Sequence, residues 1–325
     1  MNRRQLLAAA AAVPLAAAIA PRSLAARAGG AVPLALVTAD LESHVVAFDL
    51  ARGRIRRRIR VQPGPRSIEA VGFDTALVAH TEHGLLSLLD TPTLRPWLVL
   101  EDVGEPRYTA AHPDGRLAYV TDSARGEVVT VDVRRGRIVH RLDVGGPARH
   151  VTVAPGGGRV WTALGSKAGQ LAVLETTSPA RPRLLRTVRP PFLAHDVGFA
   201  PYGDRVWVTS GDRGAIALYA WDGTEPERTI AADAPPQHVA FDEIRRAYVA
   251  SGDDGTLRVH DLLSGRLLHT ARIPVGSYNV TVGWDHRVLT PSLERGTLCQ
   301  LGRAGRVLAT SRLARAAHDV CFATG

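Results

Sequence analysis

The sequence has few cysteines, a single lysine and, beyond its N-terminal segment, no long apolar run. The two cysteines, Cys299 and Cys321, are too few for a disulfide framework. They could pair in an oxidising compartment, or remain as two buried thiols. No later segment approaches the roughly 18 apolar residues that a membrane span needs. We therefore expect no transmembrane segment in the mature chain.

Several catalytic signatures are also missing from the sequence. It contains no G-x-S-x-G nucleophile elbow, no P-loop, no Rossmann glycine pattern and no C-x-x-C-H for covalent haem. These absences argue against the enzyme classes that depend on those motifs. They leave open any chemistry whose residues are assembled from distant parts of the chain.

The net charge of +9 weakens as evidence for nucleic-acid binding once its distribution is considered. Four arginines and no acids lie in the first 28 residues, which leaves +5 for the rest. Basic residues are scattered there, apart from the run Arg52–Arg60, which fits an exposed outer strand. We expect no nucleic-acid partner.

The N-terminal segment has the three parts of an export signal. It begins with Arg3-Arg4, continues with an apolar stretch from Leu6 to Ala20, and offers an A-x-A sequence at Ala26–Ala28. The arginine pair favours the twin-arginine route, and an ordinary Sec signal or an uncleaved anchor is the alternative. The sequence thus predicts an export signal over 1–28 and a mature domain over 29–325. The mature protein is expected outside the cytoplasm, as an extracellular or periplasmic, cell-envelope protein.

A repeat of 41 to 46 residues runs through the mature chain. Short β-rich segments such as "LAYVTDS", "RVWTALG" and "RVWVTSG" align with one another. The aligned anchor positions are Leu36, Leu77, Tyr119, Trp161, Trp207, Tyr248 and Leu289. Each copy shows period-two alternation, β-branched residues and Gly/Pro turns, which indicates four short strands. Seven such copies predict an all-β fold, a single seven-bladed β-propeller with four-stranded blades.

The segment Arg116–Trp161, "RLAYVTDSARGEVVTVDVRRGRIVHRLDVGGPARHVTVAPGGGRVW", resembles the YVTN-type (YncE-like) propeller repeat. It is similar in the "YVTN" strand, the G-x-V-x-V-x-D strand and the Pro- and Gly-containing connection that follows. The resemblance covers almost all of the mature chain and implies the seven-bladed fold. It implies little about chemistry, because a fold does not determine a function.

The tetrapeptide "AHDV" occurs twice, at Ala194–Val197 and at Ala317–Val320. With the strands named a to d from the axis outward, both copies begin an inner, a-type strand. The first strand of the mature chain, at Leu34, is b-type. The last strand must therefore join the first blade and close the ring, which removes open sheet edges.

The starts of the inner strands converge on one mouth of the central channel, where propeller ligands usually bind. In chain order we read them as Ser67-Ile68, Arg107-Tyr108, Arg149-His150, His195-Asp196, Gln237-His238, Tyr278-Asn279 and His318-Asp319. The candidate ligand-binding residues are Arg107, Tyr108, Arg149, His150, His195, Asp196, His238, Tyr278, Asn279, His318 and Asp319. No catalytic residue is assigned.

Three interpretations of this polar mouth remain open. The side chains could cap strands and bind channel water, hold a ligand or divalent metal, or provide a general base with an arginine at an oxyanion. The metal candidates are His195, His238, His318 and Asp196, since imidazole and carboxylate suit Zn²⁺ or Cu²⁺. Adjacent blades are the better source of ligands, because opposite histidines lie across a wide channel. The segment "HTEH" (His80–His83) is interpreted mainly as a solvated turn.

These observations predict a secreted or periplasmic monomer that binds a small ligand or a protein partner at the channel mouth. The alternative is a propeller enzyme, lyase-like or lactonase-like, acting on a small polar substrate at the same mouth with or without a divalent metal. The identity of the ligand does not follow from the sequence.

Overall fold

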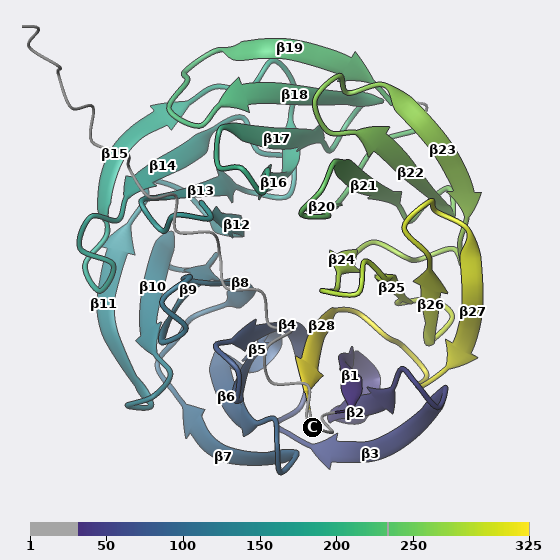
Figure 1. Ribbon diagram of the computed structural model, residues 1–325. Coiled ribbons are helices and arrows are strands. Elements are labelled where there is room, and N and C mark those ends of the chain that lie inside the picture. Colours follow the sequence, from purple (N-terminus) through teal and green to yellow (C-terminus); the bar gives the residue numbers. More distant parts are fainter. Residues whose placement is uncertain (1–31, 233, 325) are drawn as a thin grey trace, which may run out of the picture.

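The computed structural model describes residues 32–232 and 234–324. Their strands form seven four-stranded antiparallel sheets, arranged as blades around a central channel (Figure 1). The predicted all-β propeller is confirmed. The segment 1–28, predicted to be an export signal, lies outside the described residues.

Blade 1 is the blade that contains β1, and the other six follow in chain order. The inner, a-type strands of blades 1 to 7 are β28 (Val320–Thr324), β4 (Pro65–Val71), β8 (Pro106–Ala111), β12 (Ala148–Val153), β16 (Ala194–Phe199), β20 (Val239–Phe241) and β24 (Thr281–Val282). The b-type strands are β1 (Pro33–Ala39), β5 (Thr75–His80), β9 (Leu117–Asp122), β13 (Arg159–Leu164), β17 (Arg205–Ser210), β21 (Arg246–Ser251) and β25 (Val288–Ser292).

The two outer strands of each blade follow in the same order. The c-type strands are β2 (His44–Asp49), β6 (Leu85–Asp90), β10 (Glu127–Asp132), β14 (Leu171–Glu175), β18 (Ala215–Ala220), β22 (Thr256–Asp261) and β26 (Thr297–Leu301). The d-type strands are β3 (Arg54–Arg60), β7 (Arg95–Leu100), β11 (Arg137–Asp143), β15 (Arg183–Val188), β19 (Pro226–Ala231), β23 (Leu267–Arg272) and β27 (Val307–Arg312). Two short 3₁₀ turns, η2 (Asp40–Glu42) and η3 (Thr81–His83), lie in b-to-c connections. Within the described ranges, no helix has the length and apolar character to cross a membrane.

Blade 1 is built from both ends of the described chain. β28 pairs with β1 in antiparallel register, with Cys321 opposite Leu36 and Val320 opposite Val37. The predicted closure by the last strand is therefore confirmed. Because this pairing gives blade 1 the same inner and outer strands as the other blades, the ring has no unpaired junction.

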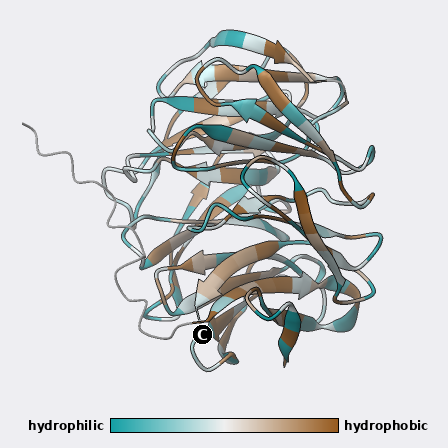
Figure 2. Ribbon diagram, turned by 45° about the vertical axis from the view of Figure 1, so that its right-hand side comes forward, coloured by the Kyte–Doolittle hydropathy of each residue, from teal (hydrophilic) through white to brown (hydrophobic). Residues whose placement is uncertain are grey.

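The core lies between neighbouring blades, where apolar residues follow the strands and polar residues mark most turns (Figure 2). The repeat anchors on the b-type strands contribute its largest side chains, and Tyr119, Trp161, Trp207 and Tyr248 are fully buried. Trp207, for example, packs with Ile216 of its own blade and Val249 of the next. The anchor residues that recur once per repeat are thus the ones that pack between one blade and the next.

Three of these anchors also make a polar contact with the next blade. The Tyr119 hydroxyl donates to the Pro179 carbonyl at 2.9 Å, and the Trp161 Nε1 donates to the Trp221 carbonyl at 3.2 Å. The Tyr248 hydroxyl donates to the Arg303 carbonyl at 2.9 Å. All three acceptors lie in c-to-d turns, so one side chain both fills the core and positions a surface turn.

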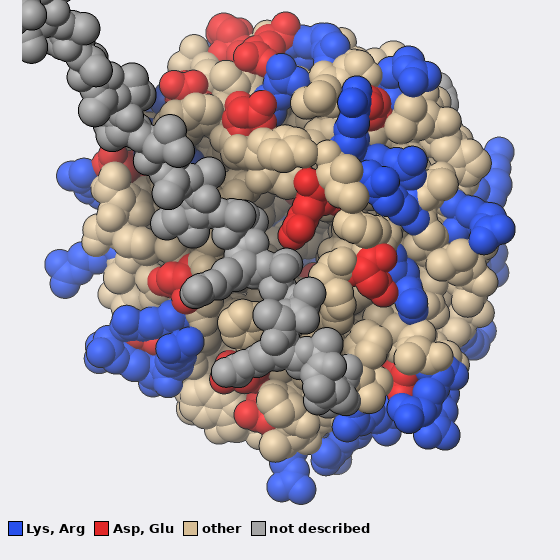
Figure 3. Space-filling model, in the orientation of Figure 1, with Lys and Arg blue, Asp and Glu red and all other residues tan. Residues whose placement is uncertain are grey.

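The basic run Arg52–Arg60 forms the outer strand β3 and its preceding turn, as expected. On the face shown in Figure 3, lysine and arginine side chains lie mainly toward the periphery of the molecule. Cys299 and Cys321 are both buried free thiols. The thiol alternative of the sequence analysis is therefore the one that the structure shows.

Removing β28 should destabilise the whole ring. Val320 and Cys321 are almost fully buried, and each buried side chain of this size contributes roughly 1.5–3 kcal/mol. We expect a chain that ends at Asp319 to lose at least about 3 kcal/mol of unfolding free energy, measured by urea denaturation. A chain that ends at Ala323 keeps the pairing of Val320–Ala323 with β1 and should remain close to wild type. Equal stability of the two truncated chains would contradict this role of β28.

Candidate functional site

The inner strands begin at one end of the channel, and the residues at or just before their starts form two stacked rings. We call the first the mouth ring: Arg66, Arg107, Arg149, His195, Gln237, Tyr278 and His318. The second ring follows one residue later: Ser67, Tyr108, His150, Asp196, His238, Asn279 and Asp319. All seven second-ring residues line a channel cavity of about 210 Å³.

The predicted position in blade 2 was wrong by one residue. Ile68 pairs with Val78 of β5, as Thr109 pairs with Val120 of β9 in blade 3. The mouth pair of blade 2 is therefore Arg66-Ser67 rather than Ser67-Ile68. This correction places a third arginine beside Arg107 and Arg149, on three consecutive blades.

Both "AHDV" aspartates connect neighbouring inner strands. The Asp196 carboxylate accepts a hydrogen bond from the Val239 backbone N–H of the next blade at 3.1 Å. The Asp319 carboxylate accepts one from Ile68 N–H, also of the next blade, at 2.9 Å. The repeated tetrapeptide thus marks the same inter-blade contact at two places in the ring.

Three histidines from blades 4, 5 and 6 form one cluster at the mouth. One ring nitrogen from each of His150, His195 and His238 lies within 4.8 Å of the others. The centroid of the His150 ring lies 4.5 Å from that of His195 and 4.8 Å from that of His238. Because these imidazoles come from adjacent blades, the width of the channel does not separate them.

Neighbouring groups orient two of the three imidazoles. His195 Nδ1 lies 3.1 Å from the Ser166 carbonyl, which requires that nitrogen to be the donor and leaves Nε2 as a lone-pair site. His238 Nδ1 lies 3.4 Å from an Asp196 carboxylate oxygen, the relation seen behind many metal-binding histidines. The Tyr108 hydroxyl lies 3.3 Å from His238 Nε2.

His150 is the most enclosed of the three. It is 1% exposed, and neither ring nitrogen makes a hydrogen bond of normal geometry. Burial, followed by the charges of His195 and His238, lowers its pKa well below the usual value, and the nearby His195 backbone offsets this only in part. Burial likewise lowers the pKa of His195 to about 4. Both imidazoles are therefore neutral near pH 7, which is the form that coordinates a metal.

The remaining predicted residues lie around the cluster with structural contacts. His318 is not part of the three-histidine group, because its Nδ1 contacts the Arg66 carbonyl at 2.8 Å. The Asn279 amide donates to the His318 carbonyl at 2.7 Å, and the Tyr278 hydroxyl donates to Asp253 at 3.0 Å. Asp196 contacts His238 rather than joining the group, so the structure brings together His150, His195 and His238 instead of the predicted metal set.

The segment His80–His83 does not gather its two histidines into one site. His80 ends β5 and is fully buried, with Nδ1 at 3.0 Å from the Pro63 carbonyl and Nε2 at 2.8 Å from Ser87 Oγ. His83 lies exposed on η3. The interpretation as a solvated turn therefore holds for His83 but is wrong for His80.

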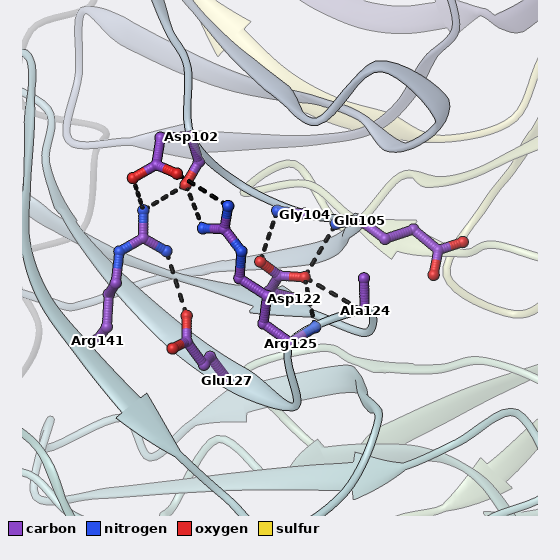
Figure 4. A network of polar contacts seen from close by, with 8 residues as sticks. All are labelled: Asp102, Gly104, Glu105, Asp122, Ala124, Arg125, Glu127 and Arg141. Atoms are coloured by element: carbon purple, nitrogen blue, oxygen red, sulfur yellow. Dashed lines mark hydrogen bonds and ion pairs between the residues drawn. The ribbon is translucent and has the colours of Figure 1, made fainter.

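A network of polar contacts holds the loop that leads into β8, the strand of Arg107 and Tyr108 (Figure 4). The Asp122 carboxylate accepts hydrogen bonds from the Gly104 and Glu105 backbone N–H groups at 2.6 and 2.9 Å. Asp102 binds Arg125 at 2.8 Å, and this contact, with the nearby Arg141, lowers the pKa of the Asp102 carboxyl. The mouth ring of blade 3 is thus positioned by its connecting loop as well as by its strand.

The opposite end of the channel has different chemistry. It opens into a hollow of about 340 Å³ whose lining includes Glu69, Phe73 and Trp284. Burial, with the charge of Asp319, raises the pKa of Glu69 to about 8. Imidazole and guanidinium groups therefore gather at one mouth, and a carboxyl group with aromatic neighbours at the other.

No protein-family model and no curated protein matches this sequence. Solved structures match its fold. A functionally unknown protein from Desulfotomaculum acetoxidans has 12% identity and a TM-score of 0.78, over 89% of this chain and 98% of that one. Kuenenia stuttgartiensis hydrazine synthase has 14% identity and a TM-score of 0.65, over 84% and 90%. The dihydro-heme d1 dehydrogenase NirN in complex with DHE has 16% identity and a TM-score of 0.61, over 89% and 74%. At these low sequence identities, the structural similarity shows that the chain has a β-propeller fold and gives no information about its activity.

The contribution of His318 to stability should depend on pH. Burial, with the charge of Arg66, lowers its pKa from 6.5 to about 3. Below about pH 6.5 this histidine is protonated in the unfolded chain, whereas in the folded chain it stays neutral down to about pH 3. Protonation therefore favours the unfolded state, and stability is lost as the pH falls through this range. As the pH falls through this range, we expect the free energy of unfolding of the wild type to drop by up to about 1.4 kcal/mol per pH unit more than that of His318→Gln. The glutamine amide can still donate to the Arg66 carbonyl.

Urea unfolding at about pH 4.5 and about pH 7 measures this difference. His83→Gln, at an exposed position, is the matched control and should keep the wild-type slope. Identical slopes for wild type and His318→Gln would exclude His318 as a source of the pH dependence.

Proposed function

We propose that this protein is an exported β-propeller that binds a divalent transition-metal ion, and through it a small polar ligand, at the three-histidine mouth of its channel. The observation that carries the proposal is the convergence of His150, His195 and His238, with His150 buried and without a hydrogen-bond partner of its own. Imidazole nitrogen suits Zn²⁺, Cu²⁺, Ni²⁺ and Fe²⁺.

The present spacing requires a modest rearrangement to hold an ion. Nitrogen ligands at about 2.0–2.1 Å from a tetrahedral Zn²⁺ lie about 3.4 Å apart, compared with the 4.8 Å limit of the cluster. Small rotations of the three rings supply this contraction. Ser166 and Asp196 hold the Nδ1 atoms of His195 and His238, so Nε2 is the nitrogen that would turn toward the ion. At His238 the ion would replace the contact of Nε2 with the Tyr108 hydroxyl.

The resemblance of the repeat to the YVTN-type family agrees with a binding or scaffold protein but carries no chemistry of its own. That resemblance concerns the strand and turn motifs, and its implied role is a propeller that holds a partner or ligand. The three-histidine mouth adds a specific chemistry, because it combines neutral imidazoles with a cavity directly beneath them.

A metal-dependent enzyme at the same mouth is the second candidate function. Three protein ligands leave a fourth coordination position, the arrangement typical of catalytic rather than structural zinc sites. A binding site should lose affinity gradually as single histidines are removed, whereas an enzyme should lose turnover steeply with one or two of them. No motif in the sequence defines a substrate class, so the substrate of such an enzyme is left to experiment.

Metal titration tests the proposed centre. Wild-type protein, purified without a histidine tag or chelator, should bind about one Co²⁺ per chain with the visible absorption of a nitrogen-coordinated ion. Each of His150→Ala, His195→Ala and His238→Ala should weaken binding by about a hundredfold or more, and Asp196→Asn by roughly 10–100-fold. The exposed His83→Ala is the control. Failure of the wild type to bind Co²⁺, Zn²⁺ or Cu²⁺ would exclude the metal centre.

Export can be tested separately with the full chain. Replacing the arginine pair by lysine, Arg3→Lys/Arg4→Lys, should leave the precursor in the cytoplasm of a bacterial host if the twin-arginine route is used. Cell fractionation measures the result, and the control is the lysine substitution Arg22→Lys. Normal export of the double variant would favour the Sec route, and cytoplasmic wild-type protein would contradict export.

A further inference from the structure

Arg149 carries a charge that nothing in the described chain neutralises. In the mouth ring, Arg66 pairs with Asp40 at 3.3 Å, and Arg107 pairs with Glu105. No carboxylate among the described residues lies within ion-pair distance of the Arg149 guanidinium, and its Nε atom is buried without a hydrogen-bond partner. A partly buried guanidinium remains charged in proteins and normally has a counter-ion.

The charges that act on Arg149 include two other guanidinium groups, those of Arg66 and Arg107. The acidic side chain whose charge reaches Arg149, Glu105, is already the ion-pair partner of Arg107. Arg149 also directly precedes His150, the most enclosed imidazole of the cluster. The charge of Arg149 acts on His150 and on His195, so a divalent cation at the three histidines would lie within reach of a guanidinium without an ion-pair partner.

The nearby acidic residues are already engaged. Asp196 accepts from Val239 N–H and contacts His238. Asp319 accepts from Ile68 N–H and from Val320 N–H, both at 2.9 Å. Neither carboxylate is free to turn toward Arg149 without breaking a contact between neighbouring inner strands. Among the described residues, no carboxylate is therefore left to neutralise Arg149.

We propose that Arg149 and the three-histidine centre form one anion subsite, which binds a small ligand through a carboxylate or phosphate group. One oxygen of the group occupies the fourth position of the metal, and the guanidinium binds the oxyanion through its fork of N–H donors. This inference rests on the proposed metal centre and adds the chemical class of its ligand. It also explains how a cation is accepted beside Arg149, since the anion offsets part of both charges.

Anion titration of the Co²⁺-loaded protein tests the subsite. Acetate and methyl phosphate are the probes, and the visible spectrum of the bound Co²⁺ reports a change of the fourth ligand. We expect Arg149→Gln to weaken binding of the preferred anion by about tenfold or more, and Arg149→Lys to fall between this variant and wild type, because lysine keeps the charge but lacks the fork. The control Arg137→Gln removes an exposed arginine of outer strand β11 and should not change the affinity.

The two proposals fail in distinguishable ways. Equal anion affinity of wild type and Arg149→Gln, both loaded with Co²⁺, overturns the subsite and leaves the metal centre intact. If the wild type takes up no metal, calorimetric titration of the metal-free proteins with the same anions decides the matter. Loss of binding in Arg149→Gln then supports an arginine-based anion site without a metal, and an unchanged affinity overturns it. The tighter of the two probes identifies the ligand as a carboxylate or a phosphate.

Discussion

The architecture of the channel mouth depends on threonine hydroxyls that join successive inner strands. Thr209 of β17 accepts a hydrogen bond from Asp196 N–H of its own blade at 3.0 Å and donates to the Gln237 carbonyl of the next blade at 2.6 Å. Thr121 connects Tyr108 and Arg149 in the same way, and Thr38 connects Asp319 and Arg66. Each bridged carbonyl belongs to a mouth-ring residue. A buried backbone group left unpaired would cost about 1–3 kcal/mol, so these hydroxyls fix the backbone of the mouth independently of its side chains.

Because the backbone is fixed in this way, the side chains of the two rings are free to differ from blade to blade. Blades 2, 3 and 4 place arginine in the mouth ring, whereas blades 4, 5 and 6 supply the three clustered histidines. The two arcs overlap at blade 4, where Arg149 and His150 are consecutive. Blade 4 is therefore the one blade that contributes both an arginine of the mouth ring and a histidine of the cluster. The chemistry of the mouth is a property of this overlap rather than of the repeat itself.

The sequence predicts the blades well because the information is local and repeated. Alternation, turn residues and the buried anchors such as Trp161 and Trp207 recur with one period, and the b-type strand at Leu34 requires closure by the last strand. It predicts the site less well. The a-to-b pairings of blades 3, 4 and 5 each contain a register irregularity near the mouth, as at Ala148/Val151, and that of blade 2 is shifted differently, at Pro65/Ser67. Because the register of blade 2 differs by one residue, the sequence pattern alone did not place Arg66 in the mouth ring. The grouping of His150 with His195 and His238, with His318 left out, depends on hydrogen bonds between distant segments, which no spacing in the chain records.

The positive surroundings of the histidines would have two opposing effects on a metal ion at the proposed centre. Burial and the neighbouring charges keep His150 and His195 unprotonated near pH 7, so a metal does not compete with protons for the nitrogen lone pairs. The same charges repel a bare divalent ion. A proton brings positive charge and only one bond, whereas a metal ion accepts three lone pairs and can carry an anion into the position beside Arg149. If the proposed centre binds a metal, the same electrostatics that disfavour protonation would favour a metal that arrives with a negatively charged ligand over one that arrives alone.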